Sequence, residues 1–217
     1  VSATMLETPP GGKKKLFQYM KSDVSISDDE QYEGDILVED SRLEINGIVF
    51  GDIYAHTSTV HLIAAARVFG NIYAIESDVQ KEDDARVAGD IVIFSETAAL
   101  KLEQIECHDI AGYKFPYTII QNNEEAPYRI ISSETYTGDL IVFEHEVMLD
   151  GKVDGDLIGI DSKLMLSDSS TVDGHVVRFG GVLEIQAGEY PLITGTAFPA
   201  IDADITSMKT EPADKKI

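Results

Sequence analysis

The sequence predicts an all-β protein that folds as a parallel β-helix, or β-solenoid, of short strands. Two observations support this prediction. Glycines that stand two positions before an apolar residue recur every 17 to 19 residues, and apolar and polar residues alternate between them. Alternation with a period of two is typical of strands that bury one face. The regular interval is not expected of antiparallel hairpins, but it matches one solenoid coil of about three short strands.

Seven glycines mark the coils, in two series. The spacings are 17, 19 and 19 in the first series and 17 and 19 in the second, after which Gly195 follows at 21. Glycine suits a solenoid corner because it relieves a bend or lets two backbones approach closely. We therefore predict that these glycines occupy corners of successive coils: Gly34, Gly51, Gly70, Gly89, Gly138, Gly155 and Gly174.

The two series are offset by 104 residues, and many other residue types recur at the same offset between 32–74 and 136–178. Any two solenoid stretches share glycine and valine. The matching spacings and the recurring tyrosines and aspartates nevertheless favour an internal duplication of a half-solenoid. The duplication predicts that Ile53 and Leu157 are equivalent inward-facing residues, and that Val49 and Val153 are another such pair.

These patterns divide the chain into five parts. Between the two regular halves, Pro116 and Pro127 disfavour interior strands, so we expect one or two distorted coils with a loop near 122–126. The predicted parts are a basic flexible tail over 1–30, the first half over 31–94, irregular connecting coils over 95–135, the second half over 136–205 and a flexible tail over 206–217. The sequence leaves open whether the solenoid is continuous or split into two.

The composition excludes several classes of function. The chain has 217 residues and a formal net charge of −22, which argues against binding to a nucleic-acid backbone. Cys107 is the only cysteine, and we find neither a signal-peptide pattern nor an apolar run of membrane-spanning length, so we expect a cytoplasmic protein. No phosphate loop, paired-cysteine motif or nucleophile motif appears. We therefore expect no cofactor and no nucleotide.

The segments "EGDILVEDSRLEINGIVFGDI" and "TGDLIVFEHEVMLDGKVDGDL" resemble the bactofilins, the polymer-forming cytoskeletal proteins of bacteria. The resemblance covers about 32–94 and 136–198. It implies a right-handed β-helix that polymerises without nucleotide by stacking its ends. It also implies a scaffold in cell shape, motility or protein localisation, and many members attach to the membrane through a short amino-terminal segment. Typical members carry one such domain, whereas this chain is doubled.

We therefore expect a non-enzymatic protein whose main partner is a second copy of itself, in an oligomer or filament. The candidates for an apolar end contact are Phe179, Val182 and Phe198, near the end of the second glycine series. The basic stretch "KKKLFQYMK" is either a tail without a binding role or a weak contact with an anionic membrane surface, because cations and small apolar anchors add up there. The residues of that contact would be Lys13, Lys14, Lys15, Leu16 and Phe17.

The alternatives are a β-helix enzyme and a carbohydrate- or ligand-binding module. Hexapeptide acyltransferases need an apolar residue every six positions, a period that is absent here. Polysaccharide-acting β-helix enzymes use carboxylates, and five aspartates follow corner glycines: Asp35, Asp52, Asp90, Asp139 and Asp156. Stacked carboxylates could hold a cation, but glycine–aspartate is also ordinary turn chemistry with local backbone donors. We favour turn chemistry, with no metal and no catalytic residue.

Overall fold

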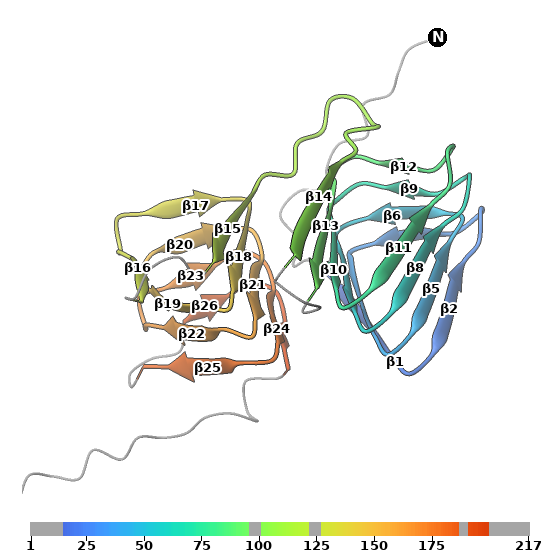
Figure 1. Cartoon of the computed structure of the whole chain (residues 1–217). Helices are drawn as coiled ribbons and strands as arrows, with labels where there is room; N and C mark the ends of the chain where they lie inside the picture. The colour runs from blue at the N-terminus through green and yellow to red at the C-terminus, as the bar shows by residue number, and fades with distance from the viewer. Residues whose placement is uncertain (1–14, 96–100, 122–126, 187–190, 200–217) are drawn as a thin grey trace, which may run out of the picture. The chain divides into compact units, whose positions relative to one another are not determined.

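The computed structural model describes residues 15–95, 101–121, 127–186 and 191–199. The chain divides into two units, Val1–Pro116 (unit 1) and Tyr117–Ile217 (unit 2). In both units, short strands of one turn pair in parallel with the equivalent strands of the next turn (Figure 1). The predicted parallel β-solenoid is thus confirmed, with about 19 residues per turn. Among the described residues, no helix is long and apolar enough to span a membrane.

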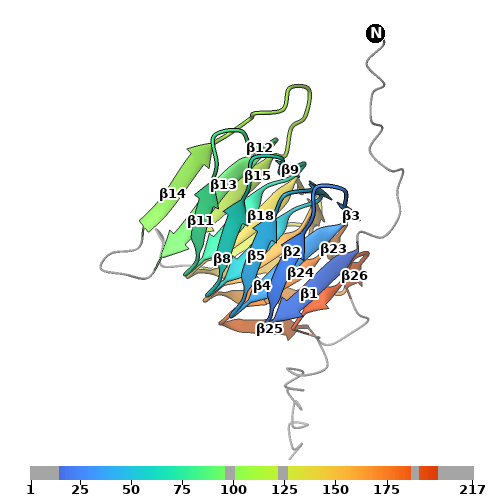
Figure 2. The same ribbon diagram turned by 90° about the vertical axis from the view of Figure 1, so that its right-hand side faces the viewer.

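Unit 1 is built from three sheets. The first has the order β1 (Leu16–Met20), β4 (Asp35–Glu39), β7 (Ile53–His56), β10 (Ile72–Ile75), β13 (Asp90–Ser95) and β14 (Lys101–Glu106). The second has the order β11 (Asp78–Lys81), β8 (Thr59–Leu62), β5 (Arg42–Ile45) and β2 (Asp23–Ile26), which lie side by side in Figure 2. The third has the order β12 (Arg86–Val87), β9 (Arg67–Val68), β6 (Ile48–Phe50) and β3 (Gln31–Glu33). One strand pair, β13 with β14, is antiparallel.

Unit 2 repeats this plan. Its first sheet has the order β15 (Tyr117–Gln121), β18 (Asp139–Phe143), β21 (Leu157–Ile160), β24 (Val176–Phe179) and β27 (Ala197–Phe198). The second has the order β16 (Tyr128–Ile130), β19 (Glu146–Leu149), β22 (Lys163–Leu166) and β25 (Val182–Ile185). The third has the order β17 (Thr135–Thr137), β20 (Lys152–Asp154), β23 (Thr171–Val172) and β26 (Leu192–Ile193).

Each unit has its own core of stacked apolar side chains. In unit 1, Ile36, Ile53 and Ile72 are consecutive members of one column, and all three are fully buried. Leu157 holds the equivalent place in the core of unit 2 and is 1% exposed. Full burial of such a side chain contributes about 1.5–3 kcal/mol. The predicted equivalence of Ile53 with Leu157 is therefore confirmed. Val49 and Val153, both fully buried, are likewise members of the two cores.

The glycine intervals differ because a single corner changes length while the strand register stays constant. Ile45 pairs with Leu62 and Ile48 pairs with Arg67, so two extra residues are accommodated between Leu62 and Arg67. Unit 2 shows the same difference at its equivalent corner, 149–152. A coil of 17 residues is therefore a coil of 19 with a shortened corner, and both stack in one register.

A second corner of each coil was not identified from the sequence. A non-glycine residue with φ between 44° and 51° occupies it in six coils: Lys21, Asp40, Thr57, Glu76, Glu144 and Asp161. In unit 1 a serine follows, and its hydroxyl accepts a hydrogen bond from the backbone amide of the equivalent serine one coil earlier. The distances are 3.1 Å from Ser22 to Ser41, 3.0 Å from Ser41 to Ser58 and 3.0 Å from Ser58 to Ser77. The serine spacing of 19, 17 and 19 is the signal that would have located this corner.

Thr57 is the least suited of these left-handed residues, because its branched Cβ crowds the backbone at a φ of 47°. Asparagine tolerates this conformation, so Thr57→Asn should raise the free energy of unfolding by about 1 kcal/mol. Thr57→Ala removes the same hydroxyl contact with Asp40. Alanine lacks the tolerance of asparagine for the left-handed conformation, so this variant should give no gain. Urea denaturation of both variants measures the free energy of unfolding. A gain in the alanine variant alone would contradict the argument that threonine is strained at this position.

The structure moves two of the predicted boundaries. Residues 16–33 form a complete first coil, although 1–30 was predicted to be a tail. The strands Tyr117–Gln121, Tyr128–Ile130 and Thr135–Thr137 form the first coil of unit 2, within the stretch 95–135 that was predicted to hold irregular connecting coils. Both coils lack the corner glycine that marks the others. In unit 1, Lys15 occupies this position, and no earlier described coil lies close enough to require a glycine there. The predicted tail over 206–217, residues 1–14 and the loop near 122–126 lie outside the described residues.

Candidate functional site: the ends of the two units

The predicted corner glycines line one edge of each unit, where successive coils make their closest backbone contact. A Cβ on Gly51 would overlap the carbonyl group of Gly34, and a Cβ on Gly155 would overlap that of Gly138. Gly70 and Gly174 stand in the same relation to the coil before them. Close approach is therefore the use that the stacked coils require of these four glycines, whereas Gly138 has a φ of 83°, which itself favours glycine.

The residue after each corner glycine forms a buried column of hydrogen-bond acceptors. In unit 1 the Asp35 Oδ1 atom accepts from the Asp52 amide at 2.7 Å, and the Asp52 Oδ1 atom accepts from the Asn71 amide at 2.6 Å. The Asn71 Oδ1 atom accepts from the Asp90 amide at 3.0 Å. In each of these three hydrogen bonds the donor belongs to the next coil rather than to the local turn. The column therefore joins the coils where glycine leaves no side chain to do so.

Unit 2 has an equivalent column with a histidine at its end. The Asp139 Oδ1 atom accepts from the Asp156 amide at 2.9 Å, and the Asp156 Oδ1 atom accepts from the His175 amide at 2.6 Å. The Thr196 amide then donates to Nδ1 of His175 at 2.8 Å. Because Nδ1 accepts, this fully buried imidazole is neutral, with its proton on Nε2. An aspartate, an asparagine and a histidine thus perform the same coil-joining role.

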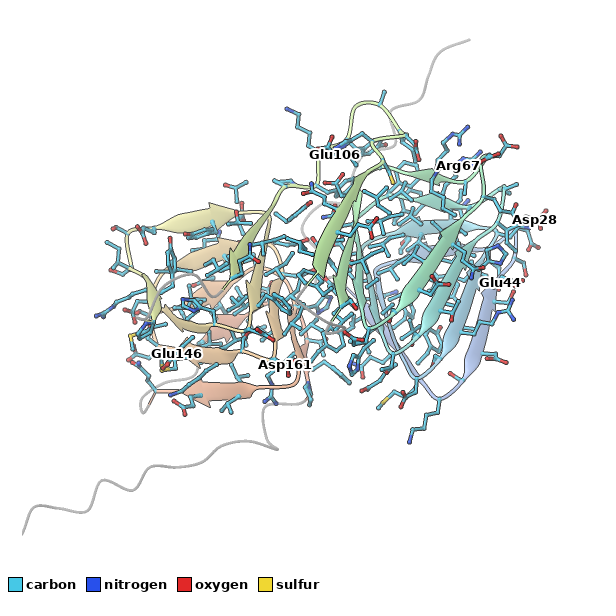
Figure 3. The ribbon with its side chains drawn as sticks, in the orientation of Figure 1. Asp28, Glu44, Arg67, Glu106, Glu146 and Asp161 are labelled. Carbon is cyan, nitrogen blue, oxygen red and sulfur yellow. The ribbon has the colours of Figure 1, made fainter. Side chains whose placement is uncertain are left out.

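Three other histidines contact carboxylates in neighbouring coils or at the unit end. His56 Nδ1 lies 3.2 Å from Glu39, and His61 Nε2 lies 3.5 Å from Glu82. His108 Nε2 lies 3.2 Å from Asp90. These contacts indicate that the three imidazole rings help to hold neighbouring strands of the solenoid together. Glu44 lies beside His61 on the same outer face, and Figure 3 shows the labelled Asp28 and Glu44 pointing away from unit 1.

The charge of the coils is partly balanced along the sheets. In unit 2, Lys163 lies between Glu146 and Glu184, with contacts of 3.3 and 3.2 Å on the two sides. Hydrogen bonds to Glu184 and then to Glu146 raise the pKa of Lys163. Lys152 contacts Asp154 of its own strand and Asp173 of the next coil. A lysine between two carboxylates lowers the repulsion between stacked acidic coils, although each exposed pair alone contributes little.

The amino-terminal end of unit 1 is an open coil. Within the described residues, β1, β2 and β3 each pair on one side only. Phe17 and Tyr32 pack edge to face with ring centroids 5.1 Å apart, and both are only half-buried. With Tyr19, they line a cavity of about 340 Å³ in which Lys15, Gln31 and Glu33 also take part. Unpaired strand edges around a half-buried apolar surface are a template for pairing with another chain.

The Tyr19 hydroxyl at this end remains protonated. The Tyr19 hydroxyl donates to the Tyr32 hydroxyl at 3.5 Å, and burial, reinforced by this contact, raises the pKa of Tyr19 to about 12. Unit 2 has a related pair in its first coil, Tyr128 and Tyr136, with hydroxyls 2.6 Å apart. Burial likewise raises the pKa of Tyr136. The first coil of each unit therefore presents amphipathic aromatic side chains.

The carboxyl-terminal end of unit 1 is closed by a different device. The antiparallel β14 covers the edge of β13, and its register places Glu103 opposite Ile93, on the inward-facing side. The strap 107–109 follows β14 and covers β12: the His108 amide donates to the Gly89 carbonyl and the Asp109 amide to the Val87 carbonyl. Lys81 contacts Asp109 at 3.2 Å. An antiparallel cover and an inward charge are means by which proteins block sheet edges.

The carboxyl-terminal end of unit 2 has no such cover among the described residues. Here β25, β26 and β27 each pair on one side only. Leu192 is 61% exposed and Val182 is 45% exposed, while Leu183, Ile193 and Ala197 pack against the core. The described residues thus place open coils at the amino-terminal end of unit 1 and at both ends of unit 2.

The predicted contact residues fall at different places. Val182 lies exposed on the terminal β25, and Phe198 lies half-buried on the terminal β27. Phe179 on β24 is only 4% exposed, so it offers a partner no apolar surface. Of the proposed membrane segment, Lys15 is exposed, Leu16 and Phe17 belong to β1, and Lys13 and Lys14 lie outside the described residues. Sequence reasoning missed Tyr19 and Tyr32, whose alternation with polar residues was the available signal.

Comparison with known proteins leaves the fold as the established result. No family model matches the chain, and no match was found among the curated proteins or the solved structures. What the sequence and the structure establish is a β-solenoid protein without helices in its described residues.

Proposed function

We propose that this protein is a structural scaffold that assembles into oligomers or filaments without nucleotide, through the ends of its solenoid units. The observation that carries the proposal is the open first coil of unit 1. Within the described residues its three strands pair on one side only, and its half-buried aromatic residues Phe17, Tyr19 and Tyr32 surround the cavity at that end. A second copy would bury this surface and pair these edges at once.

The resemblance of the two repeats to bactofilins supports the same role. It suggests a cytoplasmic polymer that serves cell shape, motility or the localisation of other proteins. Four of the five histidines and most of the corner aspartates contact neighbouring strands of the solenoid, which also favours a structural role over the enzyme alternatives. The function of such a scaffold is its assembly, so the assembly is the property to measure.

Sedimentation of the pure protein at tens of micromolar tests the proposal. At physiological salt we expect species larger than a monomer, without added nucleotide. The sedimenting fraction should rise between low and physiological salt, because a formal charge of −22 opposes association until it is screened over a Debye length of about 8 Å. Negative-stain microscopy then separates filaments from closed rings. A monomer under all these conditions would contradict the proposal.

We further propose a weak contact with anionic membranes through the basic segment that ends at Lys15. Because Leu16 and Phe17 belong to β1, deletion of residues 1–21 would also remove a strand, so charge substitution is the cleaner test. Replacing Lys13, Lys14 and Lys15 together with glutamine should abolish flotation with phosphatidylserine vesicles and leave the oligomer intact. Each lysine near such a surface contributes about 1 kcal/mol. Unchanged flotation would assign any membrane contact to another surface.

A further inference from the structure

We propose that the segment 1–8, "VSATMLET", folds back onto the open edge of β1 as an antiparallel strand and so covers the first sheet at the amino-terminal end of unit 1. The segment itself lies outside the described residues, whereas the edge that it covers is described. The inference rests on the proposed assembly, because this strand competes with a second copy for the edge. It therefore places a control of that assembly within the chain.

The covered edge has backbone groups that point away from the sheet. Within the described residues β1 pairs with β4 alone. The Lys15 carbonyl and the Lys21 amide both bond to β4. Because these groups alternate along a strand, Leu16 and Gln18 direct their amides and carbonyls to the open side of β1. An antiparallel strand on this side pairs with both residues.

Half-buried aromatic side chains lie beside the same edge. Phe17 pairs with the core residue Ile36, so the odd-numbered Phe17 and Tyr19 face inward. With Tyr32 they line the cavity of about 340 Å³ at this end of unit 1. A strand that covers the edge therefore needs apolar side chains on its inner face.

The segment has the required pattern. Within 1–5 the odd-numbered residues are apolar and the even-numbered ones are polar, and this period of two is typical of a strand with one buried face. The stretch "PPGG" follows at 9–12, and proline and glycine in such pairs mark turns. A turn between two strands that are adjacent in the chain produces an antiparallel pair.

The carboxyl-terminal end of unit 1 already shows this device. There β14 turns back on β13 as an antiparallel strand, and Ser95 pairs with Lys101, so the five residues 96–100 join the two strands. β1 and β14 are the two outermost strands of the same sheet. A strand that folds back in this way blocks the edge to other chains. The segment 1–8 thus repeats at one end of the sheet what β14 does at the other.

A connection of the same length, over 9–13, determines the register of the covering strand. It places Met5 opposite Phe17 and Ala3 opposite Tyr19, so the apolar side of the segment faces the aromatic rings. A methionine side chain fills irregular gaps and makes favourable contacts with aromatic rings. A connection one residue shorter or longer would turn the apolar side outward.

The covalent connection favours the segment over a second copy. A segment on a short tether acts at an effective concentration on the order of a millimolar, well above that of the protein in the assembly test. The edge is therefore covered in most isolated molecules, and assembly requires the segment to leave. If the segment covers the edge in about nine molecules of ten, its loss lowers the protein concentration needed for assembly by about tenfold.

Disulfide formation tests the register. In full-length chains that carry Cys107→Ser, Thr4→Cys is combined in turn with Leu16→Cys, Gln18→Cys or Met20→Cys, all on the outward side of β1. Each variant is first shown to melt within a few degrees of the unmodified protein. With oxidised glutathione as the oxidant, we expect the intramolecular disulfide to form fastest with Gln18→Cys, because Thr4 faces Gln18 in this register.

A chain without the covering strand would give rates that fall steadily as the separation from Thr4 grows from Leu16 to Met20, since loop closure becomes less favourable. That result would overturn the proposal. Disulfides between two molecules in place of intramolecular ones would overturn it as well, because they would show that the segment pairs with a second copy.

Sedimentation measures the competition with assembly. Thr4→Pro removes the amide that donates to the Gln18 carbonyl, and Thr4→Val is the matched control that keeps this amide and a strand-forming side chain. We expect Thr4→Pro to assemble at a concentration about tenfold lower than the unmodified protein, and Thr4→Val to assemble like the unmodified protein. Unchanged assembly of Thr4→Pro would overturn the competition. If neither the unmodified protein nor Thr4→Pro assembles, the proposed function is wrong, and the disulfide rates still decide whether the strand covers the edge.

Discussion

Replacement of Gly51 with alanine is expected to lower the free energy of unfolding of unit 1 by about 3 kcal/mol or more. The new Cβ would overlap the Gly34 carbonyl group, which is backbone and cannot rotate away, so two coils would have to separate. Separation also lengthens the hydrogen bond from the Asp52 amide to Asp35. Gly155→Ala should do the same to unit 2, since its Cβ would overlap Gly138.

Chemical denaturation followed by circular dichroism gives the size of this loss, and hydrogen exchange shows which unit has opened. Gly112→Ala is the control, because a Cβ there has no neighbour within 4 Å. Its φ of +91° still disfavours alanine, so a loss of about 1 kcal/mol is expected. If Gly51→Ala cost no more than Gly112→Ala, close approach of the coils would not be the reason for the glycine.

Replacement of Ile53 with aspartate should unfold unit 1 at room temperature. The carboxylate would lie in a fully buried column between Ile36 and Ile72, without a donor or a counter-charge from either neighbour. An unpaired buried charge of this kind costs several kcal/mol, a large share of the stability of a domain. Loss of the β-sheet signal by circular dichroism and loss of amide protection in unit 1 are the measurements.

The adjacent Asp52→Asn is the matched comparison and should cost less than about 1 kcal/mol. Asparagine keeps the side-chain oxygen that accepts from the next coil, as Asn71 already does in the same column. Asp52→Ala should cost more, about 1–3 kcal/mol, because it leaves the buried Asn71 amide without this acceptor. Similar stability for Ile53→Asp and Asp52→Asn would mean that the assignment of inward and outward residues is wrong.

The regular coils could be predicted because their physical requirements recur in the sequence. An inward residue such as Val49 must be apolar in every coil, and a corner such as Gly51 must lack a side chain in every coil that follows another. Both requirements leave a period that can be counted. The first coil of each unit escaped prediction for the same reason, since no earlier described coil crowds Lys15 and no glycine is needed there.

The contacts that join the coils were less predictable, because residues of different chemistry meet the same need. Asn71 and His175 replace aspartate in the acceptor columns, and Thr57 and Asp161 share a left-handed corner without sharing a side-chain type. A sequence pattern records residue type, whereas the column requires only an acceptor atom at one place. Pairing each amide with its acceptor needs the register of the next coil.

By itself, the sequence determined that this protein is a β-solenoid with two related halves, since period and burial pattern are local properties of a strand and its corners. The tertiary structure decided that the halves are separate units, that β14 reverses direction to close unit 1, and that Phe17, Tyr19 and Tyr32 gather around an open end. These features arise where the repeat stops. A strand at the end of a stack lacks a neighbour on one side, and only the fold shows which strands those are.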